Sequence, residues 1–235
     1  MTLRFLTRLA LGLTVLFTAT SCITDDDLDY TGPDPYENVA FGAIVNASPS
    51  SGDIFFFADE NQVYNGALRY GQSAGYYNFF TGDRNLSIIN AVGDTLATND
   101  ITLEAGDYFS AFAVNTFDNI ELVTYRDSLQ YPANGKAMVR FINLSPDAPA
   151  LNIATQDNTV NFATGLTFKA ATSFMPVMAG TYTVTFSDST TDEEIYTESA
   201  VEILEGRNYT IYTKGFVTPP ANSNDTFSTD KLRNL

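Results

Sequence analysis

The sequence predicts an all-β chain made of two tandem β-sandwich domains, which follow an N-terminal export segment and a short linker. Sequence landmarks recur about 100 residues apart, and each copy contains short β-branched and aromatic runs separated by turn residues. No window shows the apolar spacing of an amphipathic helix. These observations divide the 235-residue chain into residues 1–21, 22–38, 39–131 and 132–235.

The first segment has the layout of an export signal. Arg4 and Arg8 precede an apolar run at residues 9–19, and two small residues separate this run from Cys22. As a helix the run would span about 16 Å, roughly half of a ~30 Å bilayer core, so it does not predict a membrane-spanning helix. The segment resembles a bacterial lipoprotein signal with Ala19 in place of the usual Leu, which implies that Cys22 is acylated. The alternative is an ordinary secretory signal with a chance cysteine.

Residues 22–38 predict an acidic tether. Three aspartates at residues 25–27 follow the cysteine closely, and Pro33 and Pro35 favour an extended chain. The acidic run resembles the surface-export signals of some outer-membrane lipoproteins, and a solvated linker is the alternative. We therefore expect the lipid to anchor the protein in the outer membrane, with the protein exposed at the cell surface. The alternative is a protein that faces the periplasm.

The composition excludes several classes of function. The net charge of −16 becomes −18 once Arg4 and Arg8 leave with the signal. Nucleic acid is therefore not an expected partner, because it is bound through neutralising Lys and Arg. The chain has no histidine and a single cysteine, which excludes the usual zinc ligands and the Ser-His or Cys-His activation of a nucleophile. We predict no cofactor, no catalytic residue and no enzymatic activity.

Four landmarks occur twice in the same order. The Asn-x-Ser-Pro blocks at residues 46–49 and 143–146 lie 97 residues apart, and Gly82 and Gly180 lie 98 apart. The other two pairs are residues 70–76 with 168–174 and residues 103–108 with 203–209. A period near 100 is that of a small domain rather than of a solenoid repeat, so we predict one domain at each copy.

Within each copy the pattern is that of a β-sandwich. In residues 181–186, Tyr, Val and Phe alternate with threonine, as in a strand with one buried face. The blocks that end in Tyr108 and Tyr209 resemble the tyrosine corner of immunoglobulin-like sandwiches, which implies that each hydroxyl bonds back to the backbone. We therefore expect immunoglobulin-like sandwiches. The strands expected in the second copy are residues 137–143, 150–155, 173–178, 181–187, 194–204 and 209–216.

A structural role accounts for the Asn-x-Ser-Pro blocks. Asn46 and Asn143 end a strand and can form hydrogen bonds within their own turns, while Pro49 and Pro146 keep the preceding residue extended. The same Asn-x-Ser triplets match the eukaryotic glycosylation motif, which we set aside in a chain with a bacterial signal.

Two segments of the second copy resemble a known bacterial family. They are residues 139–149, Val-Arg-Phe-Ile-Asn-Leu-Ser-Pro-Asp-Ala-Pro, and residues 179–184, Ala-Gly-Thr-Tyr-Thr-Val. The family is domain of unknown function 4397, whose members are exported and often occur in tandem. The first copy departs from the pattern after Pro49, where Ser-Ser-Gly replaces Asp-Ala-Pro. The resemblance implies a fold but no activity.

Aromatic side chains of the first copy predict a binding patch. At the spacing of 97 residues, Phe55 and Phe57 align with small or polar residues of the second copy, on the face that points away from the core. Tyr77 and Phe80 can extend this patch. Exposed aromatic clusters often mark a contact surface. The alternative is that the neighbouring domain or the chain after Asp118 covers this face.

The acidic residues raise two further hypotheses, a pair of catalytic carboxylates and a calcium site. The favoured alternative to both is that these acids are solvated residues of turns. A glycosidase needs two carboxyl groups about 5 to 9.5 Å apart. The candidates are acids in or beside turns: Asp53, Asp59, Glu60, Asp83, Asp107 and the four acids of one hairpin loop. Calcium takes six to eight oxygen ligands, and the same loop offers Asp188, Asp192, Glu193 and Glu194 without the spacing of a known calcium motif.

Together these features predict a non-enzymatic binding, adhesion or scaffolding protein of the cell envelope. Its partners would be the membrane, through the lipid anchor, and an unidentified protein or glycan ligand. The alternatives are a glycan-binding lipoprotein of a polysaccharide-uptake system and a hydrolase based on carboxylates.

Overall fold

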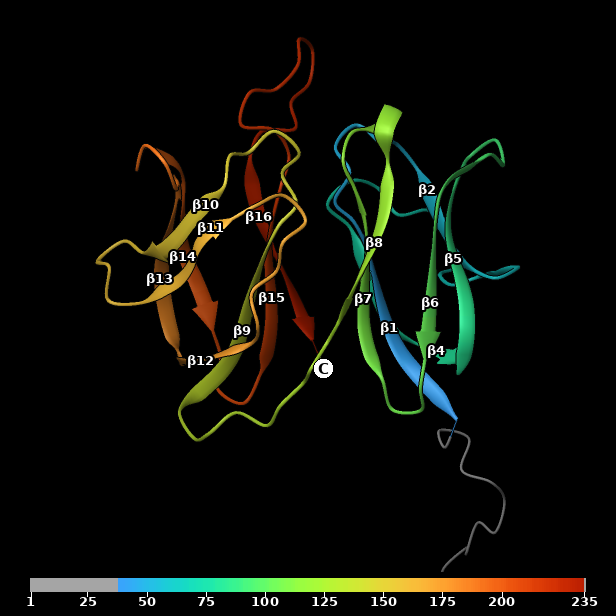
Figure 1. The fold of residues 1–235 in the computed structure, drawn as a ribbon, viewed down its shortest axis with the longest axis horizontal. Helices are drawn as coiled ribbons and strands as arrows, with labels where there is room; N and C mark the ends of the chain where they lie inside the picture. Colours follow the sequence, from blue (N-terminus) through green and yellow to red (C-terminus); the bar gives the residue numbers. More distant parts are fainter. Residues whose placement is uncertain (1–37, 235) are drawn as a thin grey trace, which may run out of the picture. The chain divides into compact units, whose positions relative to one another are not determined.

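The computed structural model describes residues 38–234 and shows an all-β body (Figure 1). Cys22, the export signal and nearly all of the predicted tether lie outside the described residues. In the described part, sixteen strands form four sheets of four strands each, arranged as two sandwiches. The predicted fold class is therefore confirmed.

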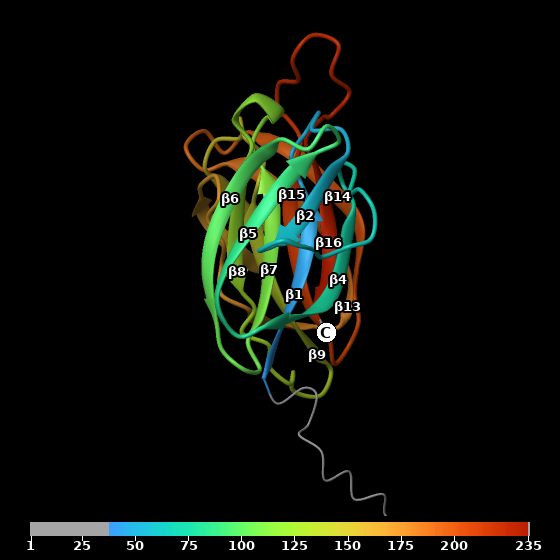
Figure 2. The same cartoon turned by 90° about the vertical axis from the view of Figure 1, so that its right-hand side faces the viewer.

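The first sandwich contains strands β1 to β8. Its inner sheet has the order β4 (Ser73–Phe80), β1 (Val39–Asn46), β7 (Tyr108–Val114) and β8 (Glu121–Arg126). Its outer sheet has the order β3 (Asn61–Gln62), β2 (Ile54–Ala58), β5 (Gly82–Asn90) and β6 (Thr95–Leu103). Figure 2 shows this outer sheet in front, with β6, β5 and β2 crossing the view.

The second sandwich repeats this topology strand for strand. Its inner sheet has the order β12 (Met175–Met178), β9 (Lys136–Asn143), β15 (Asn208–Lys214) and β16 (Ser228–Asn234). Its outer sheet has the order β11 (Asn161–Leu166), β10 (Leu151–Thr155), β13 (Gly180–Asp188) and β14 (Glu194–Ile203). In both copies the first strand pairs in parallel with the seventh, β1 with β7 and β9 with β15. The two sandwiches thus share one strand topology.

Each sandwich has its own apolar core between its two sheets. Ile54, Phe56 and Phe109 are among the buried side chains of the first core. Ile153 and Phe186 belong to the second. Because the outer sheets contribute one face to these cores, their strands alternate between buried and half-buried residues, as β2 and β10 do.

A third apolar cluster lies between the two inner sheets. It consists of Ala43, Val45, Ala47, Phe112, Val114, Ile142, Leu144, Tyr212 and Leu232. The central strands β1 and β9 are consequently buried on both faces, and seven of the eight residues in each are buried. A strand covered on both faces needs a near-continuous apolar run rather than alternation, which explains the sequences Val-Ala-Phe-Gly-Ala-Ile-Val and Ala-Met-Val-Arg-Phe-Ile. Both sandwiches belong to one compact unit.

Two strands of the second sandwich were absent from the sequence prediction. They are β11 and β16, whose sequences Asn-Phe-Ala-Thr-Gly-Leu and Ser-Thr-Asp-Lys-Leu-Arg-Asn are rich in polar residues. Both lie at a sheet edge, where one side of the strand faces solvent. Among residues 38–234 the helical structure is limited to one 3₁₀ turn at Phe117–Asn119. No helix in that range is long and apolar enough to cross a membrane.

Candidate binding site

The structure divides the predicted aromatic patch into two parts. Phe55 and Phe57 are half-buried on the outer sheet and lie opposite Ile89 and Ser87 of β5. Neither belongs to the first core. The second sandwich does not cover them, because the third cluster contains no residue of the outer sheet.

Tyr77 and Phe80 lie on β4, at the edge of the inner sheet, and line a groove together. Tyr77 packs against the first core, whereas the Phe80 side chain is 76% exposed. The groove has a volume of about 280 Å³. Its lining is completed by Ala58, Asp59, Asn61, Gln62, Val63, Asn78, Phe79 and Arg84. We call it the β4 groove.

One border of the β4 groove is fixed by an ion pair. Arg84 Nη1 lies 3.0 Å from Asp59 Oδ2, and its Nε and Nη2 donate to the carbonyls of Phe80 and Thr81 at 3.0 and 2.6 Å. The backbone N–H of Asn85 donates to Asp59 Oδ1 at 3.0 Å. This hydrogen bond and the neighbouring guanidinium lower the pKa of Asp59, so its carboxylate stays charged. Both charged groups are therefore held in place without a ligand.

The remaining polar groups of the groove are amides. Asn61, Gln62 and Asn78 are exposed and line it. Gln62 Nε2 donates to the carbonyl of Tyr64 at 2.7 Å, which leaves its amide oxygen as an acceptor. An amide offers both donors and acceptors. The arrangement suits a ligand that presents one apolar face and many hydroxyl groups, because each hydroxyl also donates and accepts.

Three of the acids that were candidates for paired carboxylates contact arginines. Asp53 lies 3.1 Å from Arg69, and Asp107 lies 3.2 Å from Arg126. Asp59 is paired with Arg84, as described above. These acids therefore do not form the facing pair that glycoside hydrolysis requires.

The four acidic side chains of the hairpin loop, Asp188, Asp192, Glu193 and Glu194, lie close together in sequence and differ in their contacts. Among residues 38–234 no group of three or more acidic side chains could hold a metal ion. Asp188 Oδ1 accepts a hydrogen bond from the amide of Thr190 at 2.7 Å, and Glu194 Oε1 accepts one from Thr197 Oγ1 at 2.8 Å. Asp192 and Glu193 are exposed. The oxygens of this loop are used locally or face solvent.

The Asn-x-Ser-Pro blocks form the same turn in both copies. Asn46 Oδ1 accepts from the amide of Ser48 at 3.1 Å, and its Nδ2 donates to the carbonyl of Leu68 at 3.0 Å. The equivalent bonds of Asn143 measure 3.2 and 3.1 Å. Both asparagines are fully buried, so neither side chain can accept a glycan in the folded protein.

Tyr108 and Tyr209 contribute their rings rather than their hydroxyls. Tyr108 stacks on Phe41 with ring centroids 4.9 Å apart. Tyr209 is part of the second core and lies under Lys231 Nζ, which is 4.9 Å from the ring centroid. Among residues 38–234 neither hydroxyl bonds to the backbone, in contrast to the role that the tyrosine-corner resemblance implies. Tyr108 is the first residue of β7, and Tyr209 is the second residue of β15.

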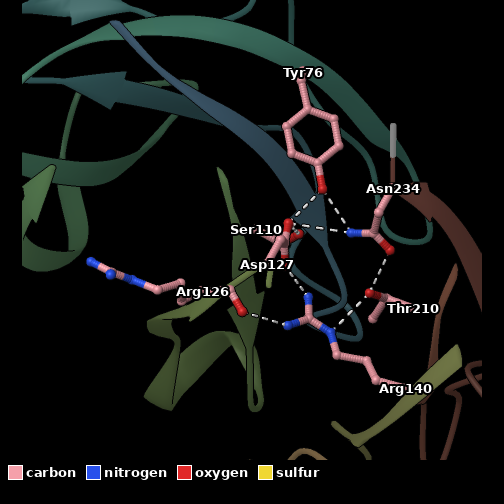
Figure 3. A network of polar contacts seen from close by, with 7 residues as sticks. All are labelled: Tyr76, Ser110, Arg126, Asp127, Arg140, Thr210 and Asn234. Carbon is pink, nitrogen blue, oxygen red and sulfur yellow. Dashed lines mark hydrogen bonds and ion pairs between the residues drawn. The ribbon is translucent and has the colours of Figure 1, made fainter. Parts of the chain in front are cut away.

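A buried polar network between the inner sheets was not anticipated from the sequence (Figure 3). Asp127, which follows β8, is fully buried, and Arg140 of β9 is 3% exposed; the two form an ion pair. Arg140 also donates to the carbonyl of Arg126 at 3.0 Å and to Thr210 Oγ1 at 2.9 Å. The one sign of this network in the sequence is Arg140 itself, a charged residue inside the apolar run of residues 137–142.

Asp127 accepts further hydrogen bonds from both sandwiches. They come from Tyr76 Oη at 2.5 Å, Ser110 Oγ at 2.6 Å and Asn234 Nδ2 at 3.2 Å. Burial and the adjacent Asp127 carboxylate raise the pKa of Tyr76, so its phenol stays protonated and donates. The network thus satisfies the buried charges with partners from both repeats.

Comparison with known proteins supports the family resemblance. Residues 41–154 match the family described as domain of unknown function (DUF4397). The chain therefore carries a region of this family. The match covers the first sandwich from β1 onward and continues through β9 into β10 of the second. No curated protein matches the chain.

Solved structures give only distant likenesses. The chain is similar to family 41 carbohydrate-binding modules from streptococcal virulence factors, with 12% identity, a TM-score of 0.23, and coverage of 80% of this chain and 96% of that one. It is also similar to the fimbrial anchor protein Mfa2 from Porphyromonas gingivalis, with 11% identity, a TM-score of 0.23, and coverage of 83% and 97%. At such TM-scores these likenesses carry no conclusion about this chain.

Proposed function

We propose that this protein is a lipid-anchored, non-enzymatic binding protein of the cell envelope and that the β4 groove binds a neutral saccharide. The observation that carries the proposal is the largely exposed ring of Phe80 beside Tyr77, in a groove bordered by three amides and a fixed ion pair. Cys22 supplies the anchor, and residues 22–38 supply the reach between membrane and body.

The groove matches the chemistry of a pyranose ring. One face of such a ring carries C–H groups, which pack on an aromatic ring such as that of Phe80. The hydroxyls at its edge need donors and acceptors together, which the amides of Asn61, Gln62 and Asn78 provide. The Asp59–Arg84 pair adds a carboxylate and a guanidinium whose positions do not have to change on binding.

A glycan array with the full-length protein in detergent tests the ligand class. We expect binding to neutral oligosaccharides, and we expect Phe80→Ala to weaken it about tenfold because the stacking platform is lost. Tyr131→Ala is the matched control, since Tyr131 is also fully exposed but lies outside the groove. Equal binding by Phe80→Ala and the unaltered protein would exclude the groove as the site.

Fractionation of cells tests the anchor separately. Cys22→Ala removes the acceptor of the lipid, so we expect the protein to leave the membrane fraction. Retention of this variant in the membrane would contradict lipid anchoring. Protease added to intact cells should remove the unaltered protein if it faces outward, whereas full protection would place it in the periplasm.

A further inference from the structure

A second cleft lies at the junction of the two sandwiches, apart from the β4 groove. Its volume is about 510 Å³, within the range of roughly 300 to 1,000 Å³ that is typical of small-molecule sites. Residues 124–126, Ser128 and Gln130 of the first repeat form one side, and Arg140 and residues 171–174 of the second form the other. We call it the junction cleft. It exists only when both repeats are present.

The lining of the junction cleft differs in charge from the rest of the protein. The chain has 28 acidic and 12 basic residues. The lining nevertheless includes Arg126 and Arg140 and, within residues 38–234, no aspartate or glutamate. The carboxylates that pair with these arginines, Asp107 and Asp127, are not part of the lining. The Arg126 side chain is therefore the accessible cation of the cleft, whereas the Arg140 side chain is only 3% exposed.

Arg140 forms a fixed base for the cleft. Its guanidinium bonds to Asp127, Thr210 and the carbonyl of Arg126, so it cannot swing away. The Phe174 ring lies 4.7 Å from its central carbon, and this ring also lines the cleft. A ligand therefore meets an apolar wall that packs on a buried, immobile guanidinium, whose charge Asp127 balances.

The rim of the cleft offers hydrogen-bond donors that the protein does not use. Among residues 38–234 the hydroxyls of Ser128 and Ser173 and the side-chain amide of Gln130 have no protein partner. Arg126 is 66% exposed and contacts Asp107 through Nη2 alone. Its other guanidinium N–H groups are free to bind a carboxylate, which an arginine can hold with two parallel hydrogen bonds.

We propose that the junction cleft is a binding site for a saccharide that carries a carboxylate, such as a uronic acid unit. Arg126 binds the carboxylate at the rim, beside the immobile Arg140. Ser128, Ser173 and Gln130 bind hydroxyl groups, and the sugar ring packs on Phe174. The proposal does not depend on the β4 groove, whose lining contains an acidic side chain and suits a neutral ligand.

Isothermal titration calorimetry on the full-length protein in detergent tests this site. The probes are a galacturonic acid trimer and, as its neutral counterpart, a galactose trimer. We expect the acidic trimer to bind at the cleft and its affinity to fall with rising salt. Arg126→Gln should weaken this binding at least about tenfold, because a charge-assisted pair of hydrogen bonds is lost. Ser173→Ala, a small change at an exposed position, should weaken it less.

Two controls separate the site from general effects. Arg69→Gln removes another exposed arginine that is paired with an aspartate, but outside the cleft, and should leave the affinity unchanged. Phe80→Ala should also leave it unchanged, which distinguishes this site from the β4 groove. The proposal is overturned if the acidic trimer does not bind, if the neutral trimer binds equally well at the cleft, or if Arg126→Gln and Arg69→Gln have the same effect.

Discussion

Arg140 and Asp127 show how a charged residue can occupy a strand that is buried on both faces. Removing two ions from water costs several kcal/mol each, and the cost is offset only when both ions are paired and fully hydrogen-bonded. Here the guanidinium has three partners and the carboxylate has four. Because these partners come from both repeats, the pair stabilises the native junction only while the two inner sheets stay in contact.

Removing the carboxylate should destabilise the protein strongly. We expect Asp127→Ala to lower the free energy of unfolding by about 3–5 kcal/mol, because Arg140 is left buried without a counter-charge. The double variant Asp127→Leu with Arg140→Met should recover much of this loss. Chemical denaturation of the single and double variants measures both quantities. A cost below about 1 kcal/mol for Asp127→Ala would show that the ion pair is not buried as described.

Gly42 in β1 is required for close packing rather than for an unusual backbone angle. A Cβ atom at this position would lie 2.4 Å from Phe109 Cζ and 2.6 Å from Phe79 Cε2. Both rings belong to the first core and cannot move freely. The glycine therefore makes room for an edge-to-face pair of phenylalanines, whose ring centroids are 4.9 Å apart.

We expect Gly42→Ala to destabilise the fold by about 1–3 kcal/mol through overpacking. Gly180→Ala is the matched control, because Gly180 also lies in a strand and its nearest side-chain atom would be 3.8 Å away. Thermal unfolding of the two variants provides the comparison. Equal midpoints would contradict the close packing around Gly42.

At the level of elements, the sequence predicted the apolar strands well and the polar edge strands poorly. Expected strands at 137–143 and 181–187 correspond to β9 and β13 within one residue at each end. β16 was missed because its sequence contains Lys231 and Arg233, which suit an edge strand but weaken any hydrophobic pattern. Only Leu232 and Asn234 of this strand are buried.

The candidate site was predictable only in part. Tyr77 and Phe80 could be singled out as aromatic residues near a turn, but their separation from Phe55 and Phe57 depends on which sheet each strand joins. Sequence periodicity gives the face of a strand and not its sheet. The Asp127–Arg140 pair depends on contacts between repeats, which no local pattern encodes.

β16 contributes to the junction in spite of its polar sequence. Leu232 belongs to the third cluster, and Asn234 Nδ2 donates to Tyr76 Oη at 2.7 Å. We expect Leu232→Ala to cost about 2–5 kcal/mol, as for other buried leucines. The exposed Val92→Ala serves as control, since Val92 is 83% exposed. A denaturation midpoint for Leu232→Ala that equals that of the control would remove β16 from the junction.

At the level of the whole molecule, the third cluster makes the two sandwiches depend on each other. The repeat period predicts one domain at 39–131 and another at 132–235, and in the structure Phe112 and Ile142 are buried between the two sandwiches. Produced alone, residues 39–131 would expose this apolar face to water. We expect the isolated repeat to unfold at a lower denaturant concentration than the full chain, or to aggregate. Equal stability would show that the domains are independent.

Alkaline pH should weaken the protein through its buried tyrosines. Burial raises the pKa values of Tyr76, Tyr125 and Tyr212 above the ordinary value of about 10. The unfolded chain releases these protons near pH 10 while the folded chain retains them, so stability is fully present below pH 10 and falls as the pH rises above it. Denaturation midpoints at about pH 8 and pH 11 check this. The decrease should be smaller in Tyr76→Phe; midpoints equal at both pH values would contradict the prediction.

Both copies pack against each other through their inner sheets, and this limits how many copies can associate in the same way. At the spacing of 97 residues, Arg140 corresponds to Ala43, so the two stacking surfaces have diverged into complementary partners. Each copy has one such surface, the outer face of its inner sheet, and in the structure the other copy covers it. The outer sheets carry polar side chains where a further copy would have to pack. These are threonine, asparagine and aspartate on β6, and glutamate, threonine and serine on β14. The duplication therefore yields a closed pair, and a third copy added to the chain would need a different interface.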